Sequence, residues 1–146
     1  PYVAFARRYD IANGYLDGTF RPEQPVSRAE LVKLIASYFT VEGGTSPFPD
    51  VPDGHWAAEV VSFAAEEGWV SGYPDGTFRP DAPVSRAEAV KILNHALDRR
   101  AGERAAALPF TDVEKGHWAC DEIREAAVSH IYRKSGEGET WLTYER

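Results

Sequence analysis

The sequence predicts a mainly α-helical domain that is built from three copies of one helix–loop–helix unit. Two duplicated phrases support this prediction. GYLDGTFRPEQPVSRAE (residues 14–30) returns as GYPDGTFRPDAPVSRAE (residues 72–88), and FPDVPDGHWA (residues 48–57) returns as FTDVEKGHWA (residues 110–119). Apolar residues with helical spacing lie between the phrases. Such internal repetition is typical of proteins in which each unit buries its apolar face against a neighbour.

The phrases divide the chain into three units with incomplete ends. Repeat one covers residues 1–40 and lacks the opening phrase, so we expect the chain to be a piece that enters within a helix. Repeat two, residues 48–98, is complete. Repeat three, residues 110–146, keeps the opening phrase and the first helix but has no GTFRP and no SRAE. We expect residues 1–146 to form a single domain, whose tail, 132–146, either folds back or leads to a further domain.

The first helix of repeat two is predicted from its apolar stripe. Trp56, Val60, Phe63 and Ala64 fall on one face of a helix, and Gly68 stands where the helix would end in the left-handed conformation. We expect this stripe to face the core.

The third repeat changes the stripe. It keeps Trp118, Ile123, Ala126 and Ile131 but places Glu122 and Glu125 where repeat two has Val60 and Phe63. We therefore expect the first helix of repeat three to be less buried on that side.

The PDGT segment of repeat two predicts a tight turn. Asp75 is placed to accept a hydrogen bond from the backbone ahead, and Gly76 supplies a positive φ. Arg79 precedes Pro80, which favours an extended conformation for the arginine.

Both SRAE segments read as S-x-x-E capping boxes at the start of a helix. Ser27 and Ser85 are the expected N-caps, so Arg28 and Arg86 stand at N1, the first helical position. The helices that follow carry apolar residues at Leu31, Leu34, Ile35 and Tyr38, and at Val90, Ile92, Leu93 and Leu97.

An arginine at N1 has two interpretations. The helix N-terminus attracts anions, and a guanidinium there can hold a carboxylate in bidentate fashion. The same arginine can instead pair with an acidic residue and lock neighbouring repeats together. The sequence leaves both open for Arg28 and Arg86, and favours the structural role for Arg21 and Arg79, which lie beside a turn.

The tryptophans of the HWA segments also have two possible roles. A tryptophan that opens an apolar stripe is usually core, but at the rim of a groove Trp56 and Trp118 can lay the ring face on a sugar. Asp50 and Asp112 read first as caps of short turns.

The composition excludes several function classes. The formal net charge of -7 argues against a nucleic-acid-binding protein, because such proteins carry a basic excess. The apolar runs are too short for membrane insertion. Cys120 is the single cysteine, has no partner at metal or nucleophile spacing, and reads as a small apolar residue. Neither a G-x-S-x-G segment nor a distinctive carboxylate pair indicates an enzyme, and we expect no metal and no cofactor.

FPDVPDGHWA, GYPDGTFRP and VSRAE, in this order and spacing, resemble the S-layer homology domain of bacterial cell-surface proteins. The resemblance covers two units and the front half of a third. It implies three repeats in a helical prism around a pseudo-threefold axis. It also implies a function outside the bacterial cell: non-covalent anchoring of exported proteins to a secondary polysaccharide linked to peptidoglycan, often through a pyruvate ketal on an amino sugar.

The resemblance implies site residues in grooves between repeats. The arginine of the family's T-R-A-E segment meets the pyruvate carboxylate, and serine in place of threonine keeps the capping oxygen. The Asp and Trp of the family's D-V-x-x-x-H-W phrase also map onto this chain. The expected ligand-binding residues are Arg28, Arg86, Trp56, Trp118, Asp50, Asp112, Ser27 and Ser85.

Repeat three lacks an SRAE arginine, and neither Arg133 nor Arg146 replaces it by motif, so we expect at most two functional grooves. Two rival hypotheses remain: a scaffold for protein–protein contacts, and the anchor fragment of a larger exported enzyme. Anchor arginines should be open to solvent, whereas scaffold arginines should be paired across repeats.

Overall fold

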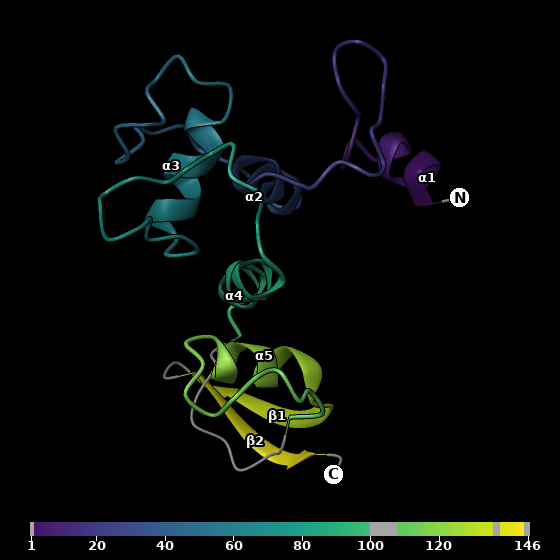
Figure 1. The fold of residues 1–146 in the computed structure, drawn as a ribbon, viewed down its shortest axis with the longest axis vertical. Coiled ribbons are helices and arrows are strands. Elements are labelled where there is room, and N and C mark those ends of the chain that lie inside the picture. Colours follow the sequence, from purple (N-terminus) through teal and green to yellow (C-terminus); the bar gives the residue numbers. More distant parts are fainter. Residues whose placement is uncertain (1, 100–107, 136–137, 145–146) are drawn as a thin grey trace. The chain divides into compact units, whose positions relative to one another are not determined.

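A computed structural model describes residues 2–99, 108–135 and 138–144 of the 146-residue chain. The described part is mainly helical, with five helices and one two-stranded sheet (Figure 1). The chain divides into two compact units, residues 1–84 and 85–146, with the boundary immediately before the second capping box. None of the helices in the described residues is long and apolar enough to cross a membrane.

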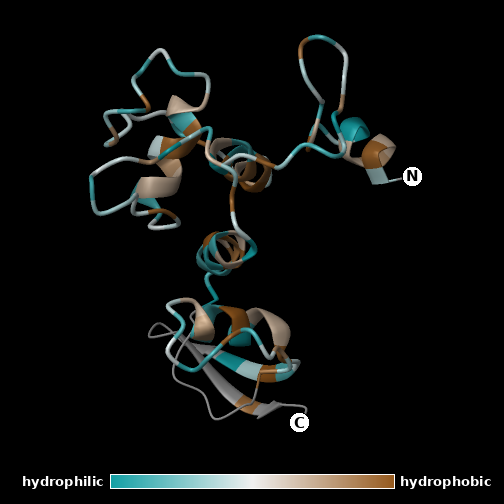
Figure 2. Ribbon diagram, viewed as in Figure 1, coloured by the Kyte–Doolittle hydropathy of each residue, from teal (hydrophilic) through white to brown (hydrophobic). Residues whose placement is uncertain are grey.

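The first unit contains α1 (Tyr2–Arg8), α2 (Arg28–Ala36) and α3 (Ala58–Glu66). α2 packs against α3, and apolar residues recur along both helices (Figure 2). α1 contains no buried residue. The buried apolar residues of this unit are Ala29, Val32, Ile35, Ala36, Phe48, Val51, Ala57, Ala58, Val61, Ala64, Trp69, Val70 and Phe78.

The buried face of α3 differs from the predicted stripe. Trp56 lies before the first residue of the helix and is 54% exposed. Val60 and Phe63 are half-buried, whereas Val61 and Ala64 are buried. The buried face therefore keeps Ala64 of the predicted stripe but has Val61 in place of Val60, and Trp56 takes the surface position that the sequence left as an alternative.

The predicted turn of repeat two is confirmed. The Asp75 carboxylate accepts the backbone N–H of Thr77 at 3.0 Å, and Gly76 has a φ of 80°. Gly68 follows α3 with a φ of 72°, which confirms the left-handed helix end.

The extended conformation expected of Arg79 is wrong. Its φ is 60°, and that of Arg21 is 54°, so both arginines lie in the left-handed region. This backbone conformation costs about 1–2 kcal/mol for a residue with a Cβ. Side-chain contacts offset the strain: Arg79 Nη2 lies 2.8 Å from Asp75 Oδ2, and the guanidinium carbon lies 4.0 Å from the ring centroid of Tyr73.

The second unit contains α4 (Arg86–Ala96), α5 (Cys120–Ala127), β1 (His130–Ser135) and β2 (Gly138–Tyr144). α4 packs against α5. The two strands form an antiparallel hairpin with a register irregularity between Ile131 and Tyr132. The helical stripe drawn through Ile131 was wrong, because α5 ends before it and the residue lies in a strand.

Glu125 corrects the expectation for the first helix of repeat three. Its side chain is only 1% exposed. Arg99 Nη2 donates to Glu125 Oε1 at 2.9 Å, and His130 Nε2 lies 3.2 Å from the same oxygen. The side chains of Arg99 and His130, rather than solvent, surround this carboxylate, so the helix is buried at a position where the sequence predicted exposure.

Candidate functional site

Both SRAE segments form the predicted capping box. Ser27 Oγ accepts the N–H of Glu30 at 3.3 Å, and Glu30 Oε2 accepts the N–H of Ser27 at 2.8 Å. The matching distances for Ser85 and Glu88 are 3.2 and 2.9 Å. Each serine oxygen is therefore engaged by its own helix, and the following arginine stands at N1 as predicted.

Arg28 is enclosed by the loop of the following repeat. Its exposed fraction is 6%, and its Nε donates to the carbonyl oxygen of Phe78 at 2.9 Å. The guanidinium carbon lies 4.7 Å from the ring centroid of Tyr73 and 5.0 Å from that of Phe78. The N–H of Arg28 donates to the oxygen of Ala82 at 3.0 Å. Arg28 is therefore paired with residues of the next repeat, as expected of an arginine that holds repeats together.

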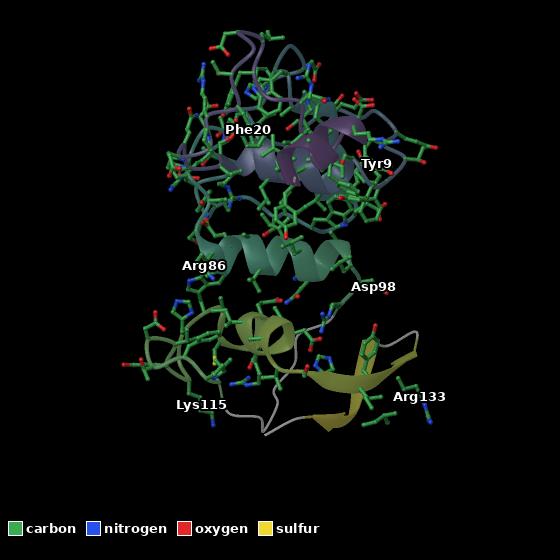
Figure 3. All side chains as sticks on the ribbon, turned by 90° about the vertical axis from the view of Figure 1, so that its right-hand side faces the viewer. Tyr9, Phe20, Arg86, Asp98, Lys115 and Arg133 are labelled. Carbon is green, nitrogen blue, oxygen red and sulfur yellow. The ribbon has the colours of Figure 1, made fainter. Side chains whose placement is uncertain are left out.

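Arg86 occupies the equivalent position but is exposed at the start of α4 (Figure 3). Within the described part of the chain its side chain makes no hydrogen bond, ion pair or aromatic contact. The loop that encloses Arg28 belongs to the following repeat, and residues 120–146 contain no GTFRP that corresponds to it. Arg86 is therefore accessible to solvent, as expected of an arginine that binds a ligand.

Both tryptophans of the HWA segments lie at the surface. Trp56 is 54% exposed and Trp118 is 60% exposed. Lys33 of α2 lies beside Trp56, with its Nζ 5.4 Å from the ring centroid. An exposed indole with an ammonium group over its ring can contact a sugar that carries a negative charge. Lys33 could not be singled out from the sequence, because its proximity to Trp56 depends on the packing of α2 against α3.

The histidines of the HWA segments have a structural role. His55 Nδ1 accepts the N–H of Ala57 at 3.1 Å, and His117 Nδ1 accepts the N–H of Ala119 at 3.2 Å. Each imidazole thereby satisfies a backbone donor at the start of α3 or α5, where the N-cap residue is alanine. The signal in the sequence for this role is the repeated spacing, with each histidine two residues before the N–H donor.

Asp50 ties the opening phrase of repeat two to the loop of the same repeat. Its carboxylate accepts the N–H of Phe78 at 2.9 Å and that of Arg79 at 2.7 Å. Burial alone would raise the pKa of Asp50, but these backbone hydrogen bonds lower it below its ordinary value. Asp112, its counterpart in repeat three, is exposed and has no hydrogen bond with a described residue.

The arginines beside the turns are engaged within their loops. Arg21 Nη2 lies 2.7 Å from Asp17 Oδ2, which repeats the pairing in the second loop. Hydrogen bonds from the Thr19 hydroxyl and from Arg21 hold the pKa of Asp17 well below its usual range. These contacts support the structural role that the sequence favoured for the turn arginines.

The structure connects two of the predicted site residues, Asp50 and Arg28, and separates others. Phe78 links these two residues through its backbone. Its N–H donates to the Asp50 carboxylate, and its carbonyl oxygen accepts a hydrogen bond from Arg28. Arg86, Trp118 and Asp112, all described residues of the second unit, share no hydrogen bond, ion pair or ring contact.

Comparisons with known proteins identify the family. The model of the S-layer homology domain matches residues 1–32 and 47–90, together slightly more than half of the chain. The cellulosome-anchoring protein of Acetivibrio thermocellus is 34% identical over 143 residues, which cover 94% of this chain and 32% of that protein. Cell surface glycoprotein 1 of the same organism is 34% identical over 96% of this chain and 6% of its own length. The S-layer protein of Bacillus licheniformis is 40% identical over 73% of this chain and 13% of its length.

The chain therefore spans a third or less of these curated relatives. The family match, and the similarity to the cellulosome-anchoring protein over nearly the whole chain, agree with the repeats, the capping boxes and the two GTFRP loops described above. This chain belongs to the S-layer homology domain family.

Proposed function

We propose that this chain is a non-catalytic anchoring module that binds an anionic polysaccharide of the bacterial cell wall. Its family places it outside the cell, in association with the wall. The names of two relatives, a cellulosome-anchoring protein and a cell surface glycoprotein, support attachment as the general role. We also propose that this polysaccharide carries pyruvate groups, and that the chain is part of a larger parent protein with further domains.

The exposed guanidinium of Arg86 carries this proposal. It stands at N1 of an eleven-residue helix, so its charge adds to that of unpaired N–H groups at the helix start. A carboxylate bound here would receive charge-assisted hydrogen bonds from a planar fork of donors. We assign the acidic substituent of the polymer to Arg86.

The two tryptophans supply the neutral part of the proposed recognition. Trp56 and Trp118 offer exposed indole faces of the kind that stack on sugar rings, and Lys33 adds a positive charge beside Trp56. In this proposal Arg28, Asp50, Ser27 and Ser85 act by holding the loops and helices in place. Asp112 remains a predicted contact. The threefold prism and the grooves between repeats also stay predictions.

Co-sedimentation with bacterial wall sacculi tests the proposal. We expect the chain to sediment with intact sacculi and to stay in solution when the attached polysaccharide has been stripped. Arg86→Ala should weaken binding about tenfold or more, as expected for one lost charge-assisted contact. Arg133→Ala removes another exposed arginine, from β1, and should leave binding unchanged.

Two results would reject the proposal. Equal binding to stripped and intact sacculi would show that the polysaccharide is not the ligand. Absence of binding by a folded chain would favour the rival scaffold hypothesis, in which Arg28 shows how the motif arginine joins repeats.

A further inference from the structure

Asn13 and Gly14 form the only Asn–Gly dipeptide of the chain, and they lie between α1 and the loop of repeat one (Figure 1). Asn13 is exposed. Among the described residues its side-chain amide makes one hydrogen bond, in which Nδ2 donates to Asp10 Oδ1 at 3.3 Å. A single exposed hydrogen bond of this kind contributes little net free energy, so it does not lock the Asn13 side chain in one orientation.

Gly14 presents its backbone nitrogen without protection. Its φ is 77°, and an added Cβ would lie 2.6 Å from the carbonyl oxygen of Thr19, so the loop requires glycine at this position. The N–H of Gly14 has no acceptor among the residues that the structure describes. The nitrogen of the residue after an asparagine is the group that can attack the side-chain carbonyl carbon Cγ and close a succinimide ring. Here neither a side chain nor a hydrogen bond shields it.

Repeat two shows that this open junction belongs to the loop itself. Ser71 takes the place of Asn13 and is also exposed, although this repeat has its opening phrase. Gly72 has a φ of 69°, and its N–H likewise finds no acceptor in the described part of the chain. The two loops therefore share the conformation, but only the first has an amide that can react.

The second asparagine of the chain is protected by the fold. Asn94 is 3% exposed, and its Nδ2 donates to Glu122 Oε2 at 2.8 Å and to the carbonyl oxygen of the same residue at 3.0 Å. His95, the residue that follows, also lies within α4, so its nitrogen is held in the helical backbone. Ring closure at Asn94 would require the helix to open locally.

The Asp–Gly pairs of the two turns are protected in another way. In Asp17–Gly18 and in Asp75–Gly76 the glycine N–H donates to the oxygen of the tyrosine three residues earlier, at 2.9 Å in both loops. Each carboxylate also accepts a hydrogen bond of 2.6 Å from the threonine hydroxyl of its own turn. The nitrogen and the side chain that would have to meet are thus both engaged, unlike those of Asn13 and Gly14.

We propose that Asn13 is a site of spontaneous modification, at which the folded chain converts an asparagine into aspartate and isoaspartate without an enzyme. The Gly14 nitrogen gives its proton to solvent base and attacks Cγ of Asn13. The bond from Cγ to Nδ2 breaks, and the amide nitrogen leaves as ammonia. Water then opens the succinimide. Attack at Cγ gives aspartate, whereas attack at the main-chain carbonyl carbon gives isoaspartate, in which the chain runs through the former side chain.

The two products should have different effects on the loop. Aspartate adds one negative charge and leaves the main chain unchanged. Isoaspartate inserts an extra methylene group into the main chain immediately before Gly14. The N–H of Tyr15 donates to the oxygen of Thr19 at 2.8 Å, and its hydroxyl donates to Glu30 of the first capping box at 2.7 Å. A longer connection from α1 should displace Tyr15 and weaken both hydrogen bonds.

Incubation of the whole chain in mildly alkaline buffer made with heavy-oxygen water tests the proposal by peptide mass spectrometry. The peptide with Asn13 should lose ammonia, take up one heavy oxygen atom and separate into two isomers on chromatography. The peptide with Asn94 should react at least about tenfold more slowly, because its helix must open first. Asn13→Ser copies the sequence of repeat two, so it should abolish the reaction and keep the loop.

The same incubation in concentrated urea shows what the fold does to the rate. We expect Asn13 to react in the folded chain within about tenfold of its rate in the unfolded chain, since the fold leaves the site open. A folded chain that reacts more slowly than this would overturn the proposal. So would a product that is aspartate alone, because direct hydrolysis of the amide makes no isoaspartate.

Urea denaturation of the separated products tests the effect on the loop. The isoaspartate form should unfold at a lower urea concentration than the unmodified chain, and the aspartate form should behave like an Asn13→Asp variant. An isoaspartate form as stable as the unmodified chain would contradict the expected displacement of Tyr15. None of these measurements involves a polysaccharide, so their outcome is independent of the proposed wall binding.

Discussion

At the scale of single residues, Arg28 and Arg86 show how one motif position acquires two environments. Arg28 donates to the carbonyl oxygen of Phe78 and lies over the rings of Tyr73 and Phe78. Arg28→Ala should lower the free energy of unfolding by about 1–3 kcal/mol, because it leaves a buried carbonyl unsatisfied and removes cation–π contacts. Urea denaturation followed by circular dichroism measures the change.

Arg86→Ala is the matched control, since it removes an arginine from the same position of the same capping box. We expect a change within about 0.5 kcal/mol, as for surface substitutions without partners. Equal destabilisation by the two substitutions would contradict the structural role assigned to Arg28.

Asp50 should give the fold a dependence on pH. Its pKa is lowered in the folded state, so the carboxylate stabilises the fold above its unfolded pKa of about 3.9 and this contribution is lost as the pH falls through the folded value. Asp50→Asn should therefore lower the free energy of unfolding by about 1–2 kcal/mol at pH 7, and by progressively less below about pH 4. Urea titrations at several pH values test this.

The exposed Asp53, three residues further along, supplies the control for this titration. Asp53→Asn should leave the unfolding curve unchanged at each pH, because its side chain has no hydrogen bond with a described residue. A pH-independent effect of Asp50→Asn would show that the carboxylate charge is not what holds the loop.

At the scale of secondary-structure elements, the pairing of Glu125 with Arg99 and His130 joins α5 to the residue that opens β1. Removing one partner of a buried ion pair costs about 3–5 kcal/mol. Because Arg99 is 29% exposed, we expect Glu125→Gln to destabilise by about 3 kcal/mol, at the low end of that range. Hydrogen exchange should accelerate first in β1 and β2.

Glu114→Gln makes the same chemical change at an exposed position and should leave hydrogen exchange in the hairpin unaffected. If Glu125→Gln destabilises the chain but the exchange rates of β1 amides do not change, the ion pair supports α5 alone.

The elements that the sequence predicted well are those fixed by local chemistry. The two capping boxes and the left-handed Gly68 and Gly76 depend on residues within a few positions of each other. The hairpin of repeat three was not predicted, because residues 132–146 carry no repeat motif and were expected to form a tail. The conformation of Arg79 was wrong because Pro80 is only one influence, and the contacts with Asp75 and Tyr73 outweigh it.

The candidate site was predictable by residue type but not by environment. The motif located Arg28 and Arg86 at N1, yet the enclosure of Arg28 depends on a loop some fifty residues away in sequence. For the same reason Lys33 became a candidate only when α2 was seen beside Trp56. Long-range packing, rather than local propensity, separates the buried from the accessible members of the repeated motif.

At the scale of the whole molecule, the net charge of -7 opposes the approach of an anionic polymer, although Arg86 and Lys33 offer local positive charge. The Debye length falls from about 30 Å at 0.01 M salt to about 8 Å at 0.15 M, so added salt screens the long-range repulsion first.

The association rate with immobilised wall polysaccharide should therefore rise severalfold between 0.01 and 0.15 M salt. A protein steered by a positive surface would show the opposite trend, because screening then removes attraction. Arg86→Ala should mainly raise the dissociation rate, since the contact forms after encounter and does not set the long-range field. Surface-based kinetics over a salt series measures both rates. A fall in the association rate with salt would mean that local positive charge, and not the net charge of the chain, governs the approach to the polymer.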